Sequence, residues 1–172
     1  MTLKDYIRDI PNFPTTGITY RDISPVLQDP LVFRHAIDSL LLKVRDMKID
    51  RIVGIESKGL IFAAPLSLQL GIGMSVARKR TGDHPLDVVG IDYALQMGTH
   101  RIEMMRDAVK KGENILIVDD LLATGVTARA TADLVQQLGG NVVAFAFLAE
   151  INYYDGAANL TDIAPVLHVY DC

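Results

Sequence analysis

Residues 114–127 read Asn-Ile-Leu-Ile-Val-Asp-Asp-Leu-Leu-Ala-Thr-Gly-Val-Thr, and this stretch decides the fold. The wholly apolar run Ile115–Val118 is typical of a central parallel strand that is buried on both faces. From Thr127 to Leu138 the apolar residues recur at helical spacing. A buried strand, a short loop and a helix in this order predict an α/β protein with a mostly parallel sheet.

The loop between this strand and this helix predicts an anion site. Its residues are Ala123, Thr124, Gly125, Val126 and Thr127. At a helix start, unpaired backbone N–H groups and the positive end of the helix dipole converge, so a phosphate group fits there. The lysine of a nucleoside-triphosphate P-loop is missing, as is a G-x-G-x-x-G run. An ordinary strand-to-helix turn is the alternative.

Two adjacent carboxylates, Asp119 and Asp120, follow the apolar run directly. They would repel a phosphate, so we expect them to bind the hydroxyls of a sugar, a divalent cation, or both. In the alternative interpretation, they only cap the turn. Phosphate, diol and cation together describe a phosphorylated ribose.

The run Val118–Gly125 resembles the 5-phosphoribosyl-1-pyrophosphate (PRPP) signature of the type I phosphoribosyltransferases, in the form found in adenine phosphoribosyltransferases. The resemblance implies an open, mostly parallel twisted sheet with a small hood and a flexible flap. It also implies Mg²⁺ as cofactor, held by Asp119 and Asp120 through water, and a homodimer. No metal ligand is directly assigned.

Length and composition favour one globular domain over residues 1–172. The chain has 172 residues, of which 49% are hydrophobic, and no apolar run approaches the length of a membrane span. Its net charge of −4 argues against general nucleic-acid binding. Residues 1–9 lack the apolar core of a signal peptide, and the only cysteine is Cys172. We therefore expect a cytoplasmic protein without membrane or nucleic-acid partners.

A second strand, Arg51–Ile55, is followed by Glu56, Ser57, Lys58 and Gly59 and then by a helical pattern. This again predicts an anion-sized site at a helix start. In the resembled family this turn is the pyrophosphate loop, to which Glu56, Ser57 and Lys58 would belong. Lys58 replaces a common arginine, so it supplies charge without a bidentate fork. A capped turn with a solvated lysine is the alternative.

A third strand is predicted over Gly73–Ala77, and three cations, Arg78, Lys79 and Arg80, follow it. Such a cluster alone would be a solvated turn. Next to two anion sites at the same edge of a sheet, Arg78 and Lys79 are better interpreted as the charge that holds pyrophosphate. We assign the catalytic role, which is electrostatic, to Asp119, Asp120, Arg78 and Lys79.

The N-terminal region predicts a short helix over residues 3–10, an ordered loop over residues 12–25 and a helix that begins at Asp29-Pro30. The loop resembles the hood segment of adenine phosphoribosyltransferases. That resemblance implies a base site formed by Thr19, Tyr20 and Arg21, with Tyr20 stacked on the purine. The hood would comprise residues 10–25 and the C-terminal part. Otherwise Tyr20 is a core aromatic.

Residues 80–105 predict a hairpin or flap, which would close over PRPP and exclude water. Here the chain departs from the resembled family, which usually has Glu-Tyr at Gln96-Met97 and a lysine near Asp83-His84. The family glutamate is the candidate for handling the purine proton, and His84 or His100 could substitute. Val126 replaces the usual second glycine of the phosphate loop, which a negative φ would allow.

Together these patterns and the resemblance predict a purine phosphoribosyltransferase that converts adenine and PRPP into AMP and pyrophosphate. Enzymes for 6-oxopurines commonly use a lysine beyond the PRPP loop, whereas this chain has no lysine after Lys111. The alternatives are a 6-oxopurine enzyme and a PRPP-binding regulator without turnover. An orotate or uracil enzyme is disfavoured by the hood sequence.

Overall fold

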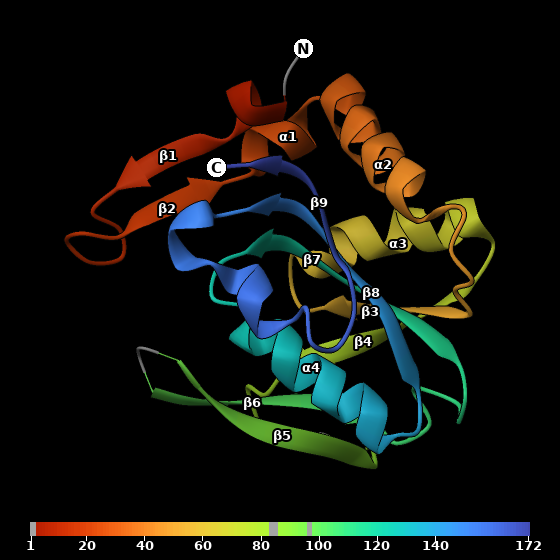
Figure 1. Cartoon of the computed structure of the whole chain (residues 1–172). Coiled ribbons are helices and arrows are strands. Elements are labelled where there is room, and N and C mark those ends of the chain that lie inside the picture. Colours follow the sequence, from red (N-terminus) through yellow and green to blue (C-terminus); the bar gives the residue numbers. More distant parts are fainter. Residues whose placement is uncertain (1–2, 83–85, 96–97) are drawn as a thin grey trace.

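The centre of the protein is a seven-stranded sheet with the order β5-β6-β4-β3-β7-β8-β9 (Figure 1). This computed structural model describes residues 3–82, 86–95 and 98–172. The strands are β3 (Arg51–Ile55), β4 (Gly73–Lys79), β5 (Val88–Leu95), β6 (Gly98–Met105), β7 (Asn114–Leu122), β8 (Asn141–Glu150) and β9 (Val166–Asp171). β4, β3, β7, β8 and β9 run parallel to one another. The β5–β6 hairpin is added at the edge of the sheet, where β6 pairs antiparallel with β4. The predicted α/β class with a mostly parallel sheet is confirmed.

Helices cover both faces of the sheet because β7 is apolar on both of its sides. Leu116 and Val118 pack in a core cluster with α2 (Pro30–Val44) and α3 (Gly59–Leu70). Ile115 and Ile117 face the opposite cluster, which contains α4 (Val126–Gln137). Alternating side chains of one strand therefore fill two cores.

Several strands are longer than their apolar runs. β7 continues to Leu122, so Asp119 and Asp120 lie within the strand, and Asp119 is opposite Phe147 of β8. β4 continues to Lys79, and Arg78 and Lys79 pair with Glu103 and Ile102 of β6. β8 begins one residue earlier and ends two residues later than the apolar run Val142–Leu148. Backbone pairing with a neighbour, which the apolar pattern does not report, extends each strand.

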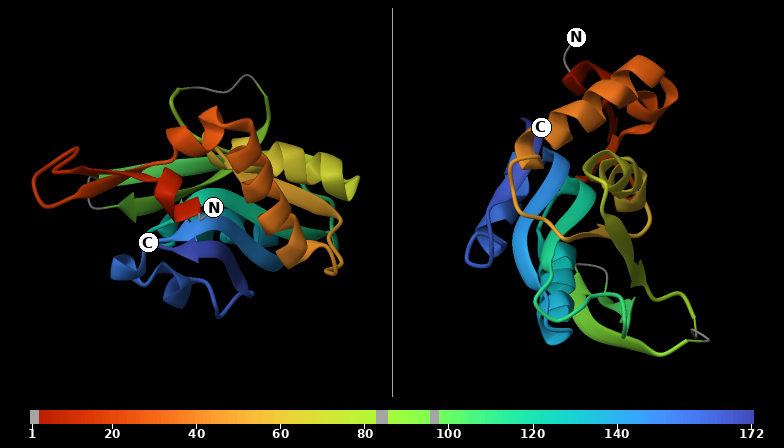
Figure 2. Two further views of the ribbon diagram at one scale, coloured as in Figure 1. Left: turned by 90° about the horizontal axis from the view of Figure 1, so that it is seen from above. Right: turned by 90° about the vertical axis from the view of Figure 1, so that its right-hand side faces the viewer.

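The predicted helix over residues 3–10 is wrong beyond its first half. A 3-10 helix, η1 (Leu3–Tyr6), is followed by β1 (Arg8–Pro11), which pairs with β2 (Thr19–Asp22). A segment this short has weak helix propensity, so long-range strand pairing decides its conformation. The hairpin β1–β2 extends away from the main sheet (Figure 2).

The start of α2 forms as predicted. The Asp29 carboxylate accepts hydrogen bonds from the backbone N–H groups of Leu31 and Val32, at 2.9 and 3.2 Å. Pro30 occupies the first turn, where its missing N–H has no consequence. A short helix, α1 (Ser24–Gln28), precedes it. Among the described helices, none is both long and apolar enough to cross a membrane.

Candidate active site

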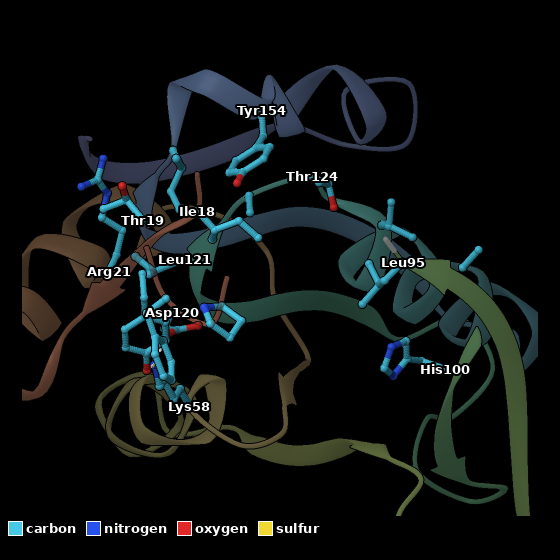
Figure 3. A pocket seen from close by; sticks show the side chains of 17 residues that line it. Ile18, Thr19, Arg21, Lys58, Leu95, His100, Asp120, Leu121, Thr124 and Tyr154 are labelled. Atoms are coloured by element: carbon cyan, nitrogen blue, oxygen red, sulfur yellow. Dashed lines mark hydrogen bonds and ion pairs between the residues drawn. The ribbon is translucent and has the colours of Figure 1, made fainter. Parts of the chain in front are cut away.

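A pocket of about 730 Å³ lies at the C-terminal ends of β3 and β7, between the β1–β2 hairpin and the β5–β6 hairpin (Figure 3). Thr19, Arg21 and Lys58 lie at one end of it, whereas Leu95 and His100 lie at the other. Between the ends, the wall includes Asp120, Leu121 and the loop after β7. The pocket therefore contacts the hood, both predicted anion loops and the flap.

The phosphate loop begins α4 through a left-handed glycine. Gly125 is the N-cap residue with a φ of 77°, and it carries no side chain that could occupy the N–H groups of the first turn. Val126 is the first residue of the helix and has a negative φ, which is the condition under which valine can replace the usual glycine of this loop. The side-chain amide of Asn159 donates to the carbonyl of Thr124 at 2.8 Å. The loop is thus held from the C-terminal segment and presents a helix start to the pocket.

Gly156 holds the phosphate loop from the other side. It opens the short helix η3 (Gly156–Asn159), and a Cβ on it would overlap the carbonyl oxygen of Ala123. In turn, a Cβ on Gly125 would lie 2.6 Å from the carbonyl oxygen of Gly156. The two backbones approach this closely only because both residues are glycines.

The paired carboxylates have different surroundings. Asp120 lines the pocket, and its carboxylate lies 3.6 Å from the ammonium of Lys58. The Asp119 carboxylate accepts a hydrogen bond from the backbone N–H of Asp120 at 2.9 Å. Burial, followed by the charge of Asp120, raises the pKa of Asp119 well above its usual range. Lys79 acts in the opposite direction on the pKa of Asp119.

The negative charge of Asp119 and Asp120 shows whether these two residues fit a divalent cation. A divalent cation would relieve the repulsion between two neighbouring carboxylates, of which Asp119 has a pKa raised by burial and then by the charge of Asp120. The oxygen donors also match the preference of Mg²⁺, which usually keeps several of its waters. The residues therefore fit a water-bridged Mg²⁺.

The pyrophosphate loop starts α3 beside these acids. The peptide between Glu56 and Ser57 is cis, and Lys58 follows as the N-cap of α3. Gly59 allows the helix start to approach β7, because a Cβ there would lie 2.7 Å from the carbonyl oxygen of Val118. Lys58 lines the pocket, so it is not the solvated lysine of an unspecialised turn.

Arg78 is bound to a buried carboxylate of the flap. Its guanidinium donates to Glu103 Oε2 at 2.8 Å, and Arg101 donates to the other oxygen of Glu103 at 3.1 Å. Glu103 is only 4% exposed. Arg78 and Lys79 belong to β4, so neither lies in a turn, but Lys79 is exposed and neither residue lines the pocket. Their pyrophosphate role stays a prediction.

The hood residues Thr19, Tyr20 and Arg21 all line the pocket. Tyr20 meets Phe13 edge to face, with ring centroids 5.6 Å apart, and Arg21 forms an ion pair with Asp9. Tyr20 is therefore a pocket residue rather than a core aromatic.

Sequence reasoning missed Ile151 and Tyr154, which line the pocket from the segment after β8; Tyr154 belongs to η2 (Asn152–Tyr154). No local pattern marks them. His100 lies at the end of the pocket that is away from the hood (Figure 3). Asp83, His84 and the Gln96-Met97 pair lie outside the described residues.

Comparison with known proteins extends these observations. The family model of the phosphoribosyl transferase domain matches residues 25–167. An adenine phosphoribosyltransferase of Maridesulfovibrio salexigens is 45% identical over 163 residues, which are 95% of each chain. The crystal structure of adenine phosphoribosyltransferase from Rhodothermus marinus is 42% identical with a TM-score of 0.92, covering 99% of this chain and 96% of that one.

A third relative carries ligands. Adenine phosphoribosyltransferase of Saccharomyces cerevisiae, in complex with adenine and an imino-altritol bisphosphate, is 36% identical with a TM-score of 0.88. The alignment of the two structures covers 97% of the present chain and 96% of the yeast chain. The chain described here therefore belongs to the phosphoribosyltransferase family, within the group formed by the adenine phosphoribosyltransferases.

Proposed function

We propose that this protein is a purine salvage enzyme that transfers the ribose 5-phosphate of PRPP to adenine, forming AMP and pyrophosphate. The observation that carries the proposal is one pocket whose wall includes the hood, Asp120 of the paired carboxylates and the loop that starts α4. The adenine phosphoribosyltransferases to which it is similar, one of them solved with adenine, support this choice of base.

Each part of PRPP and adenine has a proposed binding group. The 5-phosphate binds at residues 123–127, and Asp119 and Asp120 bind the ribose hydroxyls. Pyrophosphate lies against the loop residues Glu56, Ser57 and Lys58 and the strand residues Arg78 and Lys79. The base lies against Thr19, Tyr20 and Arg21. Mg²⁺, held through water, would supply neutralisation of the pyrophosphate charge.

The proposed reaction is a substitution at C1 of the ribose. The C1–oxygen bond to pyrophosphate breaks, the bond from C1 to a ring nitrogen of adenine forms, and the proton of that ring leaves. The protein holds the two reactants in line and stabilises the charge of the departing pyrophosphate. The flap of residues 80–105 excludes water from the positively charged ribose. No covalent nucleophile is required.

Adenine should be preferred over hypoxanthine by about tenfold or more in kcat/KM, because a backbone carbonyl of the hood can accept from its amine, while the chain has no lysine after Lys111 that could serve a 6-oxo group. The measurement is pyrophosphate release from PRPP with and without Mg²⁺, using adenine, hypoxanthine, guanine, uracil and orotate. Equal use of hypoxanthine would contradict the adenine assignment. Tight PRPP binding without turnover of any base would indicate the regulator.

We also propose a homodimer that forms through α3 and β4. Ile61, Leu68 and Val76 are exposed large apolar residues on these neighbouring elements, and Leu68 is 84% exposed. Exposed apolar patches mark interaction surfaces, and two-fold dimers are the commonest homo-oligomers. We further propose that the chain forms one domain, with residues 10–25 as hood, and that the protein is cytoplasmic. The single cysteine accords with a reducing compartment.

Leu68→Glu should shift the mass measured by light scattering from dimer toward monomer, since a carboxylate cannot be buried unpaired at an interface. Tyr153→Glu is the matched control, because Tyr153 is 88% exposed and lies on η2 rather than on α3 or β4. A monomeric wild-type protein, or a dimer that Leu68→Glu does not weaken, would exclude this interface.

A further inference from the structure

Lys58 lies where three proposed subsites meet. Its ammonium donates to the hydroxyl of Tyr20 at 2.8 Å and lies 3.6 Å from the carboxylate of Asp120. The same nitrogen is 4.9 Å from the centre of the Tyr20 ring. These residues come from the hood strand β2, the start of α3 and the strand β7. Lys58 and Asp120 lie together at the hood end of the pocket (Figure 3).

The electrostatic environment of Lys58 keeps it charged. Burial acts to lower its pKa, but the hydrogen bond to Tyr20 and the charge of Asp120 outweigh burial, so the pKa is raised. Lys58 is therefore a cation at every pH near neutrality. An ammonium group is the form that a pyrophosphate oxygen requires.

A charged lysine must also be aimed. Its side chain has about 2 kcal/mol of rotamer entropy, and its ammonium lacks the planar fork that orients an arginine. The hydroxyl of Tyr20 occupies one of the three N–H donors and so restricts the direction of the others. The contact with Asp120, at 3.6 Å, is longer than a hydrogen bond. Tyr20 therefore provides the stronger fixation.

Stacking on a purine requires only the ring of Tyr20, so the hydroxyl is free to serve another purpose. We propose that Tyr20 is a positioning residue for the pyrophosphate site: its hydroxyl holds the Lys58 ammonium at the leaving group while its ring contacts the base. This inference rests on the proposed function. It makes one hood residue common to the base and pyrophosphate subsites, and it couples their occupancy in both directions.

The test compares Tyr20→Phe, Lys58→Met and the double variant in the full chain. Tyr20→Phe keeps the ring and removes the hydroxyl, so KM for PRPP should rise about fivefold to tenfold, the usual worth of one hydrogen bond. KM for adenine should change less than about twofold, since stacking persists. In the Lys58→Met background, Tyr20→Phe should have no further effect on KM for PRPP.

Two further variants sharpen the comparison. Lys58→Arg supplies its own fork, so it should reduce the effect of Tyr20→Phe on KM for PRPP to under about twofold. Tyr153→Phe removes the hydroxyl of an exposed tyrosine outside the pocket and should leave KM for PRPP unchanged. This control separates the loss of a specific hydroxyl from the loss of any hydroxyl.

An equal rise of both KM values in Tyr20→Phe, or the same rise of KM for PRPP with and without Lys58, would overturn the proposal. Calorimetric titration with magnesium pyrophosphate measures the same coupling without turnover. A wild-type protein that binds pyrophosphate but transfers ribose to no base would refute the proposed function alone. The calorimetric cycle would still decide the role of Tyr20.

Discussion

Asp119→Asn should nearly abolish transfer to adenine while making the folded protein more stable near neutral pH. The loss of activity follows from removing a carboxylate that we propose to bind the ribose and to favour the cation, and we expect it to be about 100-fold or more. The gain in stability follows from the raised pKa of Asp119, since burial and the adjacent Asp120 disfavour its charged form. Asparagine is neutral, and its amide oxygen can still accept the hydrogen bond from the Asp120 N–H.

The sign of the pH dependence follows from the same shift. The pKa of Asp119 in the folded protein lies above the ordinary value of 3.8, so the folded state binds this proton more tightly than the unfolded state. The stability that protonated Asp119 contributes is therefore complete below the ordinary pKa of 3.8 and is lost as the pH rises through the raised pKa of the folded protein. Because asparagine does not titrate, the stability difference between variant and wild type should grow across this window and then level off.

Thermal unfolding of both proteins from acid to neutral pH, without added metal, measures this difference. Each 1 kcal/mol corresponds to about 2–4 °C in a chain of this size. Asp120→Asn is the comparison, because it removes the neighbouring charge but also the ion pair with Lys58. A variant Asp119→Asn that melts below the wild type at neutral pH, or retains full activity, would contradict the assignment.

Gly125→Ala should raise KM for PRPP by about 100-fold or more, because it disrupts the backbone that we propose to bind the 5-phosphate. Alanine at a φ of 77° costs about 1–2 kcal/mol by itself. Its Cβ would also lie 2.6 Å from the carbonyl oxygen of Gly156, which is backbone and cannot rotate away. The loop and η3 would have to separate, and the N–H groups of α4 would move with them.

Two other glycines separate these causes. Gly71 has a φ of 66° with open space around it, so Gly71→Ala tests backbone strain alone and should leave KM for PRPP unchanged. Gly156 has no positive φ, yet a Cβ there would meet the Ala123 carbonyl, so Gly156→Ala tests the close approach alone. We expect Gly156→Ala to weaken PRPP binding and Gly71→Ala only to lower stability. If Gly125→Ala, Gly71→Ala and Gly156→Ala all had the same KM for PRPP, the start of α4 would not be the phosphate site.

The elements that were predicted well are those whose signal is contained in a few neighbouring residues. Ile115–Val118 is apolar at every position, and this alone indicates a strand buried on both faces. Asp29-Pro30 starts a helix through its own carboxylate and ring. The short helix predicted over residues 3–10 failed because β2, about ten residues further on, pairs with half of it.

The candidate site divides in the same way. A strand that ends in acids, a small-residue loop and a helix start were legible in order along residues 114–127, because parallel strands bring such loops to one edge. Ile151 and Tyr154 were not legible, because their place in the pocket depends on how the segment after β8 folds back.

The sequence by itself determined the parallel sheet, the helix start that forms the candidate anion site and the acids beside it, because each is encoded in local patterning and loop chemistry. Only the tertiary structure decided that Arg78 binds the buried Glu103 and that Lys58 binds the hydroxyl of Tyr20. These partners are separated by 25 and 38 residues. Contacts at such a distance are set by strand pairing and packing, which leave no periodic mark on the chain.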